Sequence, residues 1–211
     1  MTDLVIVLFG LTLLYISAIS RLEGYIRALA VQGFLLTLLV VVAGGRINIW
    51  NLAFIVLETL GFKTFVIPWF LTKVVRENEI SRETEPYITN FYSLLFTSLI
   101  FAFSFFIAYW AVRNVTDVRP LHFGISIATI VFGLFIILTR KKLITHTMGF
   151  MIIENGIFLL SLAKVHEMPM IVNTGILLDL FLAVFLLGIF INKIKSSFEE
   201  LDVNELTYLK D

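Results

Sequence analysis

Long apolar runs separated by short polar breaks make up most of this chain. A helix needs roughly 20 apolar residues to cross the hydrocarbon core of a membrane. The runs that approach or exceed this length cover residues 4–20, 28–43, 49–75, 90–112, 120–139, 147–163 and 170–191. The pattern therefore predicts an all-α integral membrane bundle of about seven transmembrane helices, without a soluble catalytic domain.

The first run, Leu4 to Ser20, lacks a basic segment before it and a small-residue cleavage site after it. We expect it to be a retained first helix rather than a signal peptide. The longest internal break, Arg76 to Pro86, is dense in charge but too short to fold by itself. We therefore expect one transmembrane domain over 1–211.

The distribution of lysine and arginine predicts the orientation, because cytoplasmic loops carry the excess of these residues. If the amino terminus lies outside, the outer loops hold few of them: Arg46, Arg113, Arg119 and Lys164. The inner loops then hold the basic run Arg140-Lys-Lys142, which we interpret as a topology determinant. This orientation places the carboxy-terminal tail in the cytoplasm.

The amino-acid composition agrees with a membrane protein and excludes some kinds of metal site. The chain is 59% hydrophobic and 15% charged, with a mean hydropathy of +0.95 and a formal net charge of zero. A soluble domain of this size needs more polar surface. The chain has no cysteine and only three histidines, which excludes thiolate ligation of iron–sulfur clusters or zinc. We expect no cofactor in this chain, so electrons would be carried by a partner.

Four ionisable residues lie inside predicted spans: Glu58, Lys63, Glu154 and Asp179. A charge at mid-bilayer costs about 2.5–3.5 kcal/mol on insertion scales. Such residues therefore face the bundle interior, a hydrated path or a partner protein.

Glu154 is flanked by apolar residues for more than one turn on each side, and Gly149 and Gly156 would allow a neighbouring helix to approach closely. Burial disfavours the charged form of a carboxylate unless a cation lies near. Glu154 can therefore load and release a proton. Asp179 is expected at a similar depth on the next helix, where the two acids could exchange a proton or share one.

Lys63 supplies the opposite sign. In an α-helix, Glu58 and Lys63 would point about 140° apart and would not stack on one face. The flexible lysine could still reach Glu58, or it could pair with a carboxylate of another helix or subunit. Pro68 lies in the second half of the same long run, 49–75, and predicts a kink or break there.

The alternative is that these charges are paired only for assembly, and Glu58, nearer the outer half of its helix, fits that alternative best. Gln32 is expected to hydrogen-bond across helices. The histidines lie at helix ends and are too dispersed for a metal site, and the tryptophans are typical of interfacial anchors. These residues are His122, His146, His166, Trp50, Trp69 and Trp110.

Two segments resemble a known helix pair. Gly149-Phe-Met-Ile-Ile-Glu-Asn-Gly156 and Gly175-Ile-Leu-Leu-Asp179 are similar to the acidic helices of the small K subunit of respiratory complex I and of its counterpart in Mrp-type cation/proton antiporters. This chain differs from the K subunit at Asp179, where the K subunit usually carries Glu.

The whole chain resembles component E of hydrogenase 4, a membrane subunit of formate-hydrogenlyase-type, energy-converting nickel–iron hydrogenases. The residues that carry this resemblance are Tyr25, Gln32, Lys63-Thr-Phe-Val-Ile-Pro68, Glu154-Asn-Gly156 and the tail from Leu201 to Lys210.

The resemblance implies four helices in about 1–115, three K-subunit-like helices in about 120–195 and a cytoplasmic tail at 196–211. It also implies a non-catalytic subunit of an oxidoreductase complex in a bacterial or archaeal plasma membrane. Glu154, Asp179, Lys63 and Glu58 would contribute to a proton or sodium path. Antiporter-like and H-subunit-like membrane partners would adjoin it, with nickel–iron and iron–sulfur centres elsewhere in the complex.

Two further interpretations remain open. The chain could be a passive scaffold of the same complex, or a component of a Mrp-type antiporter. A free-standing transporter is disfavoured, because no inverted repeat with paired broken helices is evident in the sequence.

Overall fold

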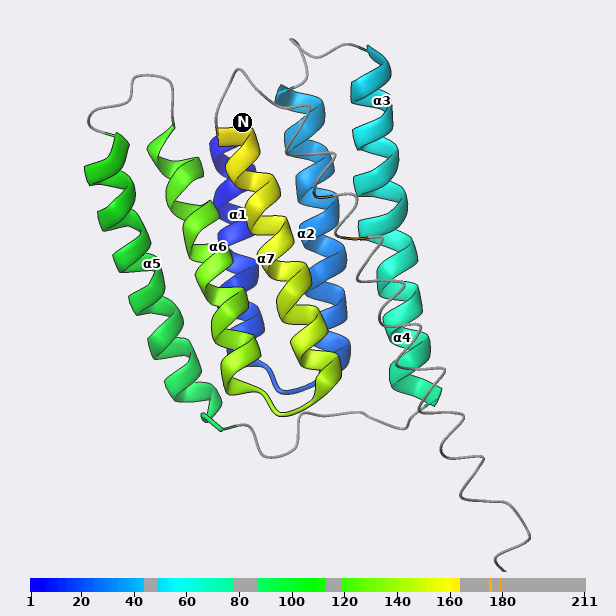
Figure 1. Cartoon of the computed structure of the whole chain (residues 1–211), viewed down its shortest axis with the longest axis vertical. Coiled ribbons are helices and arrows are strands. Elements are labelled where there is room, and N and C mark those ends of the chain that lie inside the picture. Colours follow the sequence, from blue (N-terminus) through cyan, green and yellow to red (C-terminus); the bar gives the residue numbers. More distant parts are fainter. Residues whose placement is uncertain (44–48, 78–86, 113–118, 164–174, 176–178, 180–211) are drawn as a thin grey trace, which may run out of the picture. The chain divides into compact units, whose positions relative to one another are not determined.

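The computed structural model describes residues 1–43, 49–77, 87–112 and 119–163, together with Gly175 and Asp179. All regular secondary structure in these ranges is helical. The helices are α1 (Thr2–Ala18), α2 (Leu22–Ala43), α3 (Ile49–Leu57), η2 (Glu58–Val66), α4 (Ile67–Glu77), α5 (Asn90–Val112), α6 (Pro120–Thr139) and α7 (Leu143–Ala163). The long helices lie side by side and alternate in direction (Figure 1).

Five of the described helices are long and apolar enough to cross a membrane. They cover Leu22–Val42, Leu52–Arg76, Asn90–Ala111, Pro120–Thr139 and Leu143–Ala163, and α1 is a shorter apolar helix of 17 residues. The predicted multi-pass, all-helical membrane fold is confirmed at this level. The seventh predicted run, 170–191, lies outside the described residues apart from Gly175 and Asp179, so the count of seven and the orientation stay predictions.

The chain divides into two compact units, Met1–Gly175 and Ile176–Asp211. The first unit contains every helix named above. Asp179 belongs to the second unit, in which it is the only described residue; it is helical and partly buried.

Helices α6 and α7 pack through glycines, as the sequence predicts for Gly149 and Gly156. A Cβ atom added to Gly133 would lie 2.7 Å from the carbonyl oxygen of Gly149. One added to Gly156 would lie 2.9 Å from the backbone nitrogen of Ile130. The two backbones are thus in direct contact above and below Glu154, which fixes the position of its helix.

The sequence predicts a kink or a break near Pro68; the run is helical throughout from Ile49 to Glu77, so the helix does not break there. Instead, the nine residues of η2 adopt π-helical geometry and end at Val66, two residues before the proline. The backbone N–H of Ile67 donates to the carbonyl of Phe62, five residues earlier, as in a π-helix. Since Pro68 has no N–H and crowds the carbonyl four residues before it, we attribute the wider turn to this residue.

The outer surface of α5 is apolar and aromatic, which suits contact with lipid or with other membrane proteins. Its buried side carries small hydroxyl residues, Ser93, Thr97 and Ser104. The predicted interfacial anchors Trp50, Trp69 and Trp110 are all exposed.

Candidate functional site

Lys63 and Glu154 form an ion pair inside the bundle. Lys63 Nζ lies 2.9 Å from Glu154 Oε1, and the two residues are only 6% and 2% exposed. Lys63 lies near the middle of the span Leu52–Arg76 and Glu154 near the middle of Leu143–Ala163. The lysine therefore pairs with a carboxylate of another helix, which is one of the alternatives that the sequence left open.

The π-helical turn determines which side chains η2 buries. Glu58, Thr59 and Lys63 are its buried residues. The prediction that Glu58 and Lys63 point about 140° apart assumed α-helical geometry and is wrong for this segment. Because a π-helix bonds residue i to residue i+5, residues five apart come to neighbouring positions on one face.

Gly33 of α2 allows η2 to come close enough for this arrangement. A Cβ atom at Gly33 would lie 2.9 Å from the backbone carbon of Lys63 and 2.9 Å from Thr64 Oγ1. Next to this contact, Thr37 Oγ1 donates to Thr59 Oγ1 at 3.0 Å. The backbone that carries Lys63 is therefore held against α2 by close packing and by a hydrogen bond.

A chain of hydrogen bonds continues from the lysine across the bundle. Lys63 Nζ also donates to Asn155 Oδ1 at 3.4 Å, and Asn155 Nδ2 donates to Gln32 Oε1 at 3.0 Å. Gln32 Nε2 donates to Thr12 Oγ1 at 2.8 Å, and Thr12 Oγ1 donates to the carbonyl of Phe9 at 2.6 Å. The chain joins η2, α7, α2 and α1, and it confirms that Gln32 bonds across helices.

The groups at the two ends of this hydrogen-bonded network set the direction of its bonds: the Lys63 ammonium can only donate, and the Thr12 hydroxyl, which donates to the carbonyl of Phe9, accepts from Gln32. An ammonium group can only donate, so Asn155 must turn its carbonyl oxygen toward the lysine. Its amide nitrogen then donates to Gln32, whose own nitrogen is left for Thr12.

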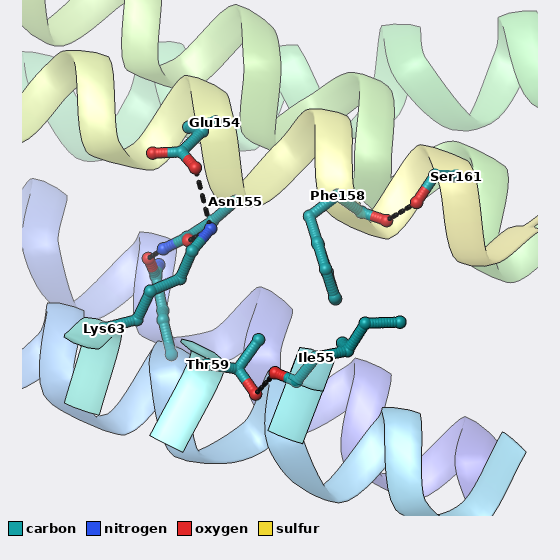
Figure 2. A network of polar contacts seen from close by, with 8 residues as sticks. Ile55, Thr59, Lys63, Glu154, Asn155, Phe158 and Ser161 are labelled. Carbon is teal, nitrogen blue, oxygen red and sulfur yellow. Dashed lines mark hydrogen bonds and ion pairs between the residues drawn. The ribbon is translucent and has the colours of Figure 1, made fainter. Parts of the chain in front are cut away.

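Phe158 completes the surroundings of the lysine. Its ring centroid lies 5.3 Å from Lys63 Nζ, within the range of a cation–π interaction. Figure 2 shows Glu154, Asn155 and Phe158 on α7 facing Lys63 and Thr59 on the opposing segment. The ammonium group thus has a carboxylate, an amide oxygen and an aromatic ring around it.

This network of hydrogen bonds runs across the helix bundle rather than along the helix axes. Thr12, Gln32, Lys63 and Glu154 each lie towards the middle of their helices. Thr12 also lines an outward-facing groove between α1 and α2, of about 360 Å³. The lining of this groove includes Tyr15 and Arg27 and is otherwise apolar. The network therefore extends sideways from the centre of the first unit to Thr12, a buried residue next to this groove.

The other predicted site residues have the following positions. Glu58 is buried, on the same face of η2 as Lys63. Asp179 lies in the second unit, so its proton exchange with Glu154 stays a prediction. In the first unit, a Cβ atom on Gly175 would lie 4.0 Å from Glu154 Oε1.

The histidines do not form a metal cluster within the described ranges. His122 Nδ1 is 3.8 Å from Asp3 Oδ1, and His146 Nε2 contacts the carbonyl of Arg140 at 2.6 Å. His166 lies outside the described residues.

Asn155, which contacts both Lys63 and Gln32, had no predicted role of its own. The available signal was its position next to Glu154 inside an apolar run, because a buried amide needs hydrogen-bonding partners.

Comparison with known proteins gives a distant relative without a stated activity. The chain is 28% identical over 205 residues to a protein of Mycobacterium tuberculosis named "Uncharacterized protein Rv0085", and the match covers 96% of this chain and 93% of the relative. No protein-family model and no solved structure matches. The similarity over nearly the full length of both chains indicates a shared architecture.

Proposed function

We propose that this chain is a membrane subunit of an energy-converting hydrogenase or a related complex-I-like oxidoreductase. In this proposal, the Lys63–Glu154 pair takes part in moving protons that are coupled to redox chemistry in partner subunits. The observation that carries the proposal is the burial of this pair at the middle of two membrane-spanning helices. Nickel–iron and iron–sulfur centres would belong to the partners.

The chemistry of the pair supports this role. The 2.9 Å hydrogen bond joins a proton donor directly to a carboxylate acceptor. When a third charge approaches, the proton on the lysine can pass to the carboxylate, which leaves both groups neutral. An apolar surrounding lowers the cost of this neutral state relative to the ion pair. The pair can therefore alternate between two states that differ in local charge.

The resemblance to component E of hydrogenase 4 supports the choice of complex. Among its motif residues, Gln32, Lys63, Glu154 and Asn155 lie far apart in the sequence yet meet in one hydrogen-bonded network. Antiporter-like and H-subunit-like partners are the proposed neighbours. Transport of sodium in place of protons is a variant of the same proposal.

The test is proton transport by the assembled complex in membrane vesicles. We expect Glu154→Gln and Lys63→Gln each to lower the proton transport that accompanies the redox reaction at least several-fold, while the redox reaction with an artificial acceptor continues. Lys73→Gln is the matched control, because Lys73 is an exposed lysine of α4 and its loss should leave transport unchanged. Unaltered transport by assembled Glu154→Gln would overturn the proposal.

A scaffold role is the second candidate, and one observation favours it. The amide and hydroxyl bonds of Asn155, Gln32 and Thr12 tie α1, α2 and α7 together without any group that readily gives up a proton. If the pair served only to extend this clamp, removing both of its charges together would leave transport intact.

A further inference from the structure

Arg140 is a buried arginine whose guanidinium group has no hydrogen-bond acceptor among the described residues. The residue is 1% exposed, and within the part of the chain that the structure describes, Nε, Nη1 and Nη2 of Arg140 all lack a hydrogen-bonding partner. We interpret the basic run Arg140-Lys-Lys142 as a topology determinant, a role for which an exposed side chain is expected. Burying a cation without a partner costs several kcal/mol, so this arginine requires an explanation.

The backbone of Arg140 is fixed on both sides. Its N–H donates to the carbonyl of Ile136 at 3.1 Å, and its carbonyl accepts a hydrogen bond at 2.6 Å from His146 Nε2, which must carry the proton because a carbonyl only accepts. The connection between α6 and α7 is thereby held in place. These two hydrogen bonds fix the backbone position of Arg140 in this turn.

The ring of Tyr25 lies against the guanidinium group, with 5.9 Å between Arg140 Cζ and the ring centroid. A cation–π contact uses the face of the planar guanidinium. The N–H donors project from its edges, where a bidentate anion such as a phosphate would bind. The contact with Tyr25 uses none of these donors, and Nε, Nη1 and Nη2 of Arg140 have no hydrogen-bond acceptor among the described residues.

The surroundings of Arg140 are those of a membrane interface. Arg140 directly follows the span Pro120–Thr139. Leu138 and Leu143, which flank the basic run, are 76% and 54% exposed, and Lys141 is exposed with its Nζ 4.9 Å from the ring centroid of Tyr87. Exposed leucines, a basic side chain and an exposed tyrosine thus lie around the end of this span, which is the combination typical of a membrane interface.

We propose that Arg140 binds the phosphate of an anionic phospholipid. Basic sites between membrane-spanning helices at the interface bind anionic headgroups, and the long side chain of arginine near a helix end can extend to the headgroup layer. In the bound state, Arg140 turns from the interior toward the interface, near Lys141, and its fork donates to the phosphate. Without such a lipid it returns to its buried position beside Tyr25.

The test compares the full-length chain in phosphatidylcholine nanodiscs with the same chain in nanodiscs that also contain phosphatidylglycerol. Without anionic lipid, we expect Arg140→Met to melt higher than the parent chain, because the substitution removes an unpaired buried charge. Phosphatidylglycerol should raise the melting temperature of the parent chain by several degrees and that of Arg140→Met much less. The parent chain should then melt close to or above Arg140→Met. Lys141→Met, a matched change at the exposed neighbour, should keep most of the parent's response.

Three outcomes would overturn the proposal. In the first, Arg140→Met responds to phosphatidylglycerol as strongly as the parent chain. In the second, inorganic phosphate in phosphatidylcholine nanodiscs reproduces the full shift, which assigns the site to a free anion. In the third, neither lipid nor phosphate shifts the parent chain, which leaves a partner protein's carboxylate as the counterion.

If Arg140→Met fails to fold, Arg140→Lys provides the same test. It keeps the charge but loses the bidentate fork, so we expect it to lower the response to phosphatidylglycerol several-fold. An unchanged response would contradict the proposal.

Discussion

Lys63 Nζ and Glu154 Oε1 lie 2.9 Å apart at the centre of the first unit, although 91 positions separate the two residues in the sequence. The contact joins the π-helical segment η2 to α7, and Asn155 continues it to α2. Any displacement of η2 along or away from its neighbours therefore changes the distance between the two charges. The stability and the function of this membrane bundle are expected to depend on the same few contacts.

The first prediction concerns the close approach of α2 and η2. Gly33→Ala should destabilise the chain by about 1–3 kcal/mol, the usual cost of overpacking, because its Cβ would lie 2.9 Å from the backbone of Lys63. Thermal unfolding in detergent measures this effect. Gly61→Ala, on the same π-helical segment, is the control, since nothing lies within 4 Å of a Cβ there. Equal melting temperatures for the two variants would show that η2 does not lie against Gly33.

The second prediction concerns the amide pair Gln32 and Asn155. In a double-mutant cycle with Gln32→Leu and Asn155→Leu, we expect a coupling free energy of about 0.6 kcal/mol, the average for hydrogen bonds between membrane helices, and at most about 1.7 kcal/mol. The coupling should stabilise the chain, because either single substitution removes the hydrogen bond between the two amides. A coupling free energy of zero would mean that the two amides do not bond.

The third prediction concerns the packing of α6 on α7. Gly133→Ala should lower the melting temperature, because the added methyl group would lie 2.7 Å from the carbonyl oxygen of Gly149, a backbone atom that cannot turn aside. Gly10→Ala serves as the control, since its nearest neighbours would lie at an ordinary 3.5 Å. A larger loss for Gly10→Ala than for Gly133→Ala would contradict the described helix contact.

Much of the fold could be predicted from the sequence because the bilayer imposes a simple rule. Apolar runs of sufficient length must form helices, and the described spans coincide with six of the predicted runs to within a few residues at most of their ends. The close helix contact at Gly149 and Gly156 followed from the same reasoning, since only small residues allow backbones to touch.

The geometry around Lys63 was beyond prediction from the sequence. Pro68 indicated a distortion in this run but not a π-helix over the nine residues of η2. The α-helical spacing that was assumed therefore placed Glu58 and Lys63 on different faces. The partner of Lys63 was also ambiguous, because pairing between helices depends on rotation about each helix axis. Arg140 has the sequence context of an ordinary loop cation, and only its burial beside Tyr25 distinguishes it.

The central claim is that the Lys63–Glu154 pair moves charge rather than only holding helices together. The most direct measurement is proton transport by vesicles that contain the assembled complex with the double variant Lys63→Met/Glu154→Met. Removing one partner of a buried pair costs about 3–5 kcal/mol, whereas removing both leaves no unpaired charge. We therefore predict that the double variant assembles better than Lys63→Met alone and yet fails to transport protons. Proton transport at the parental rate by the assembled double variant would contradict the claim.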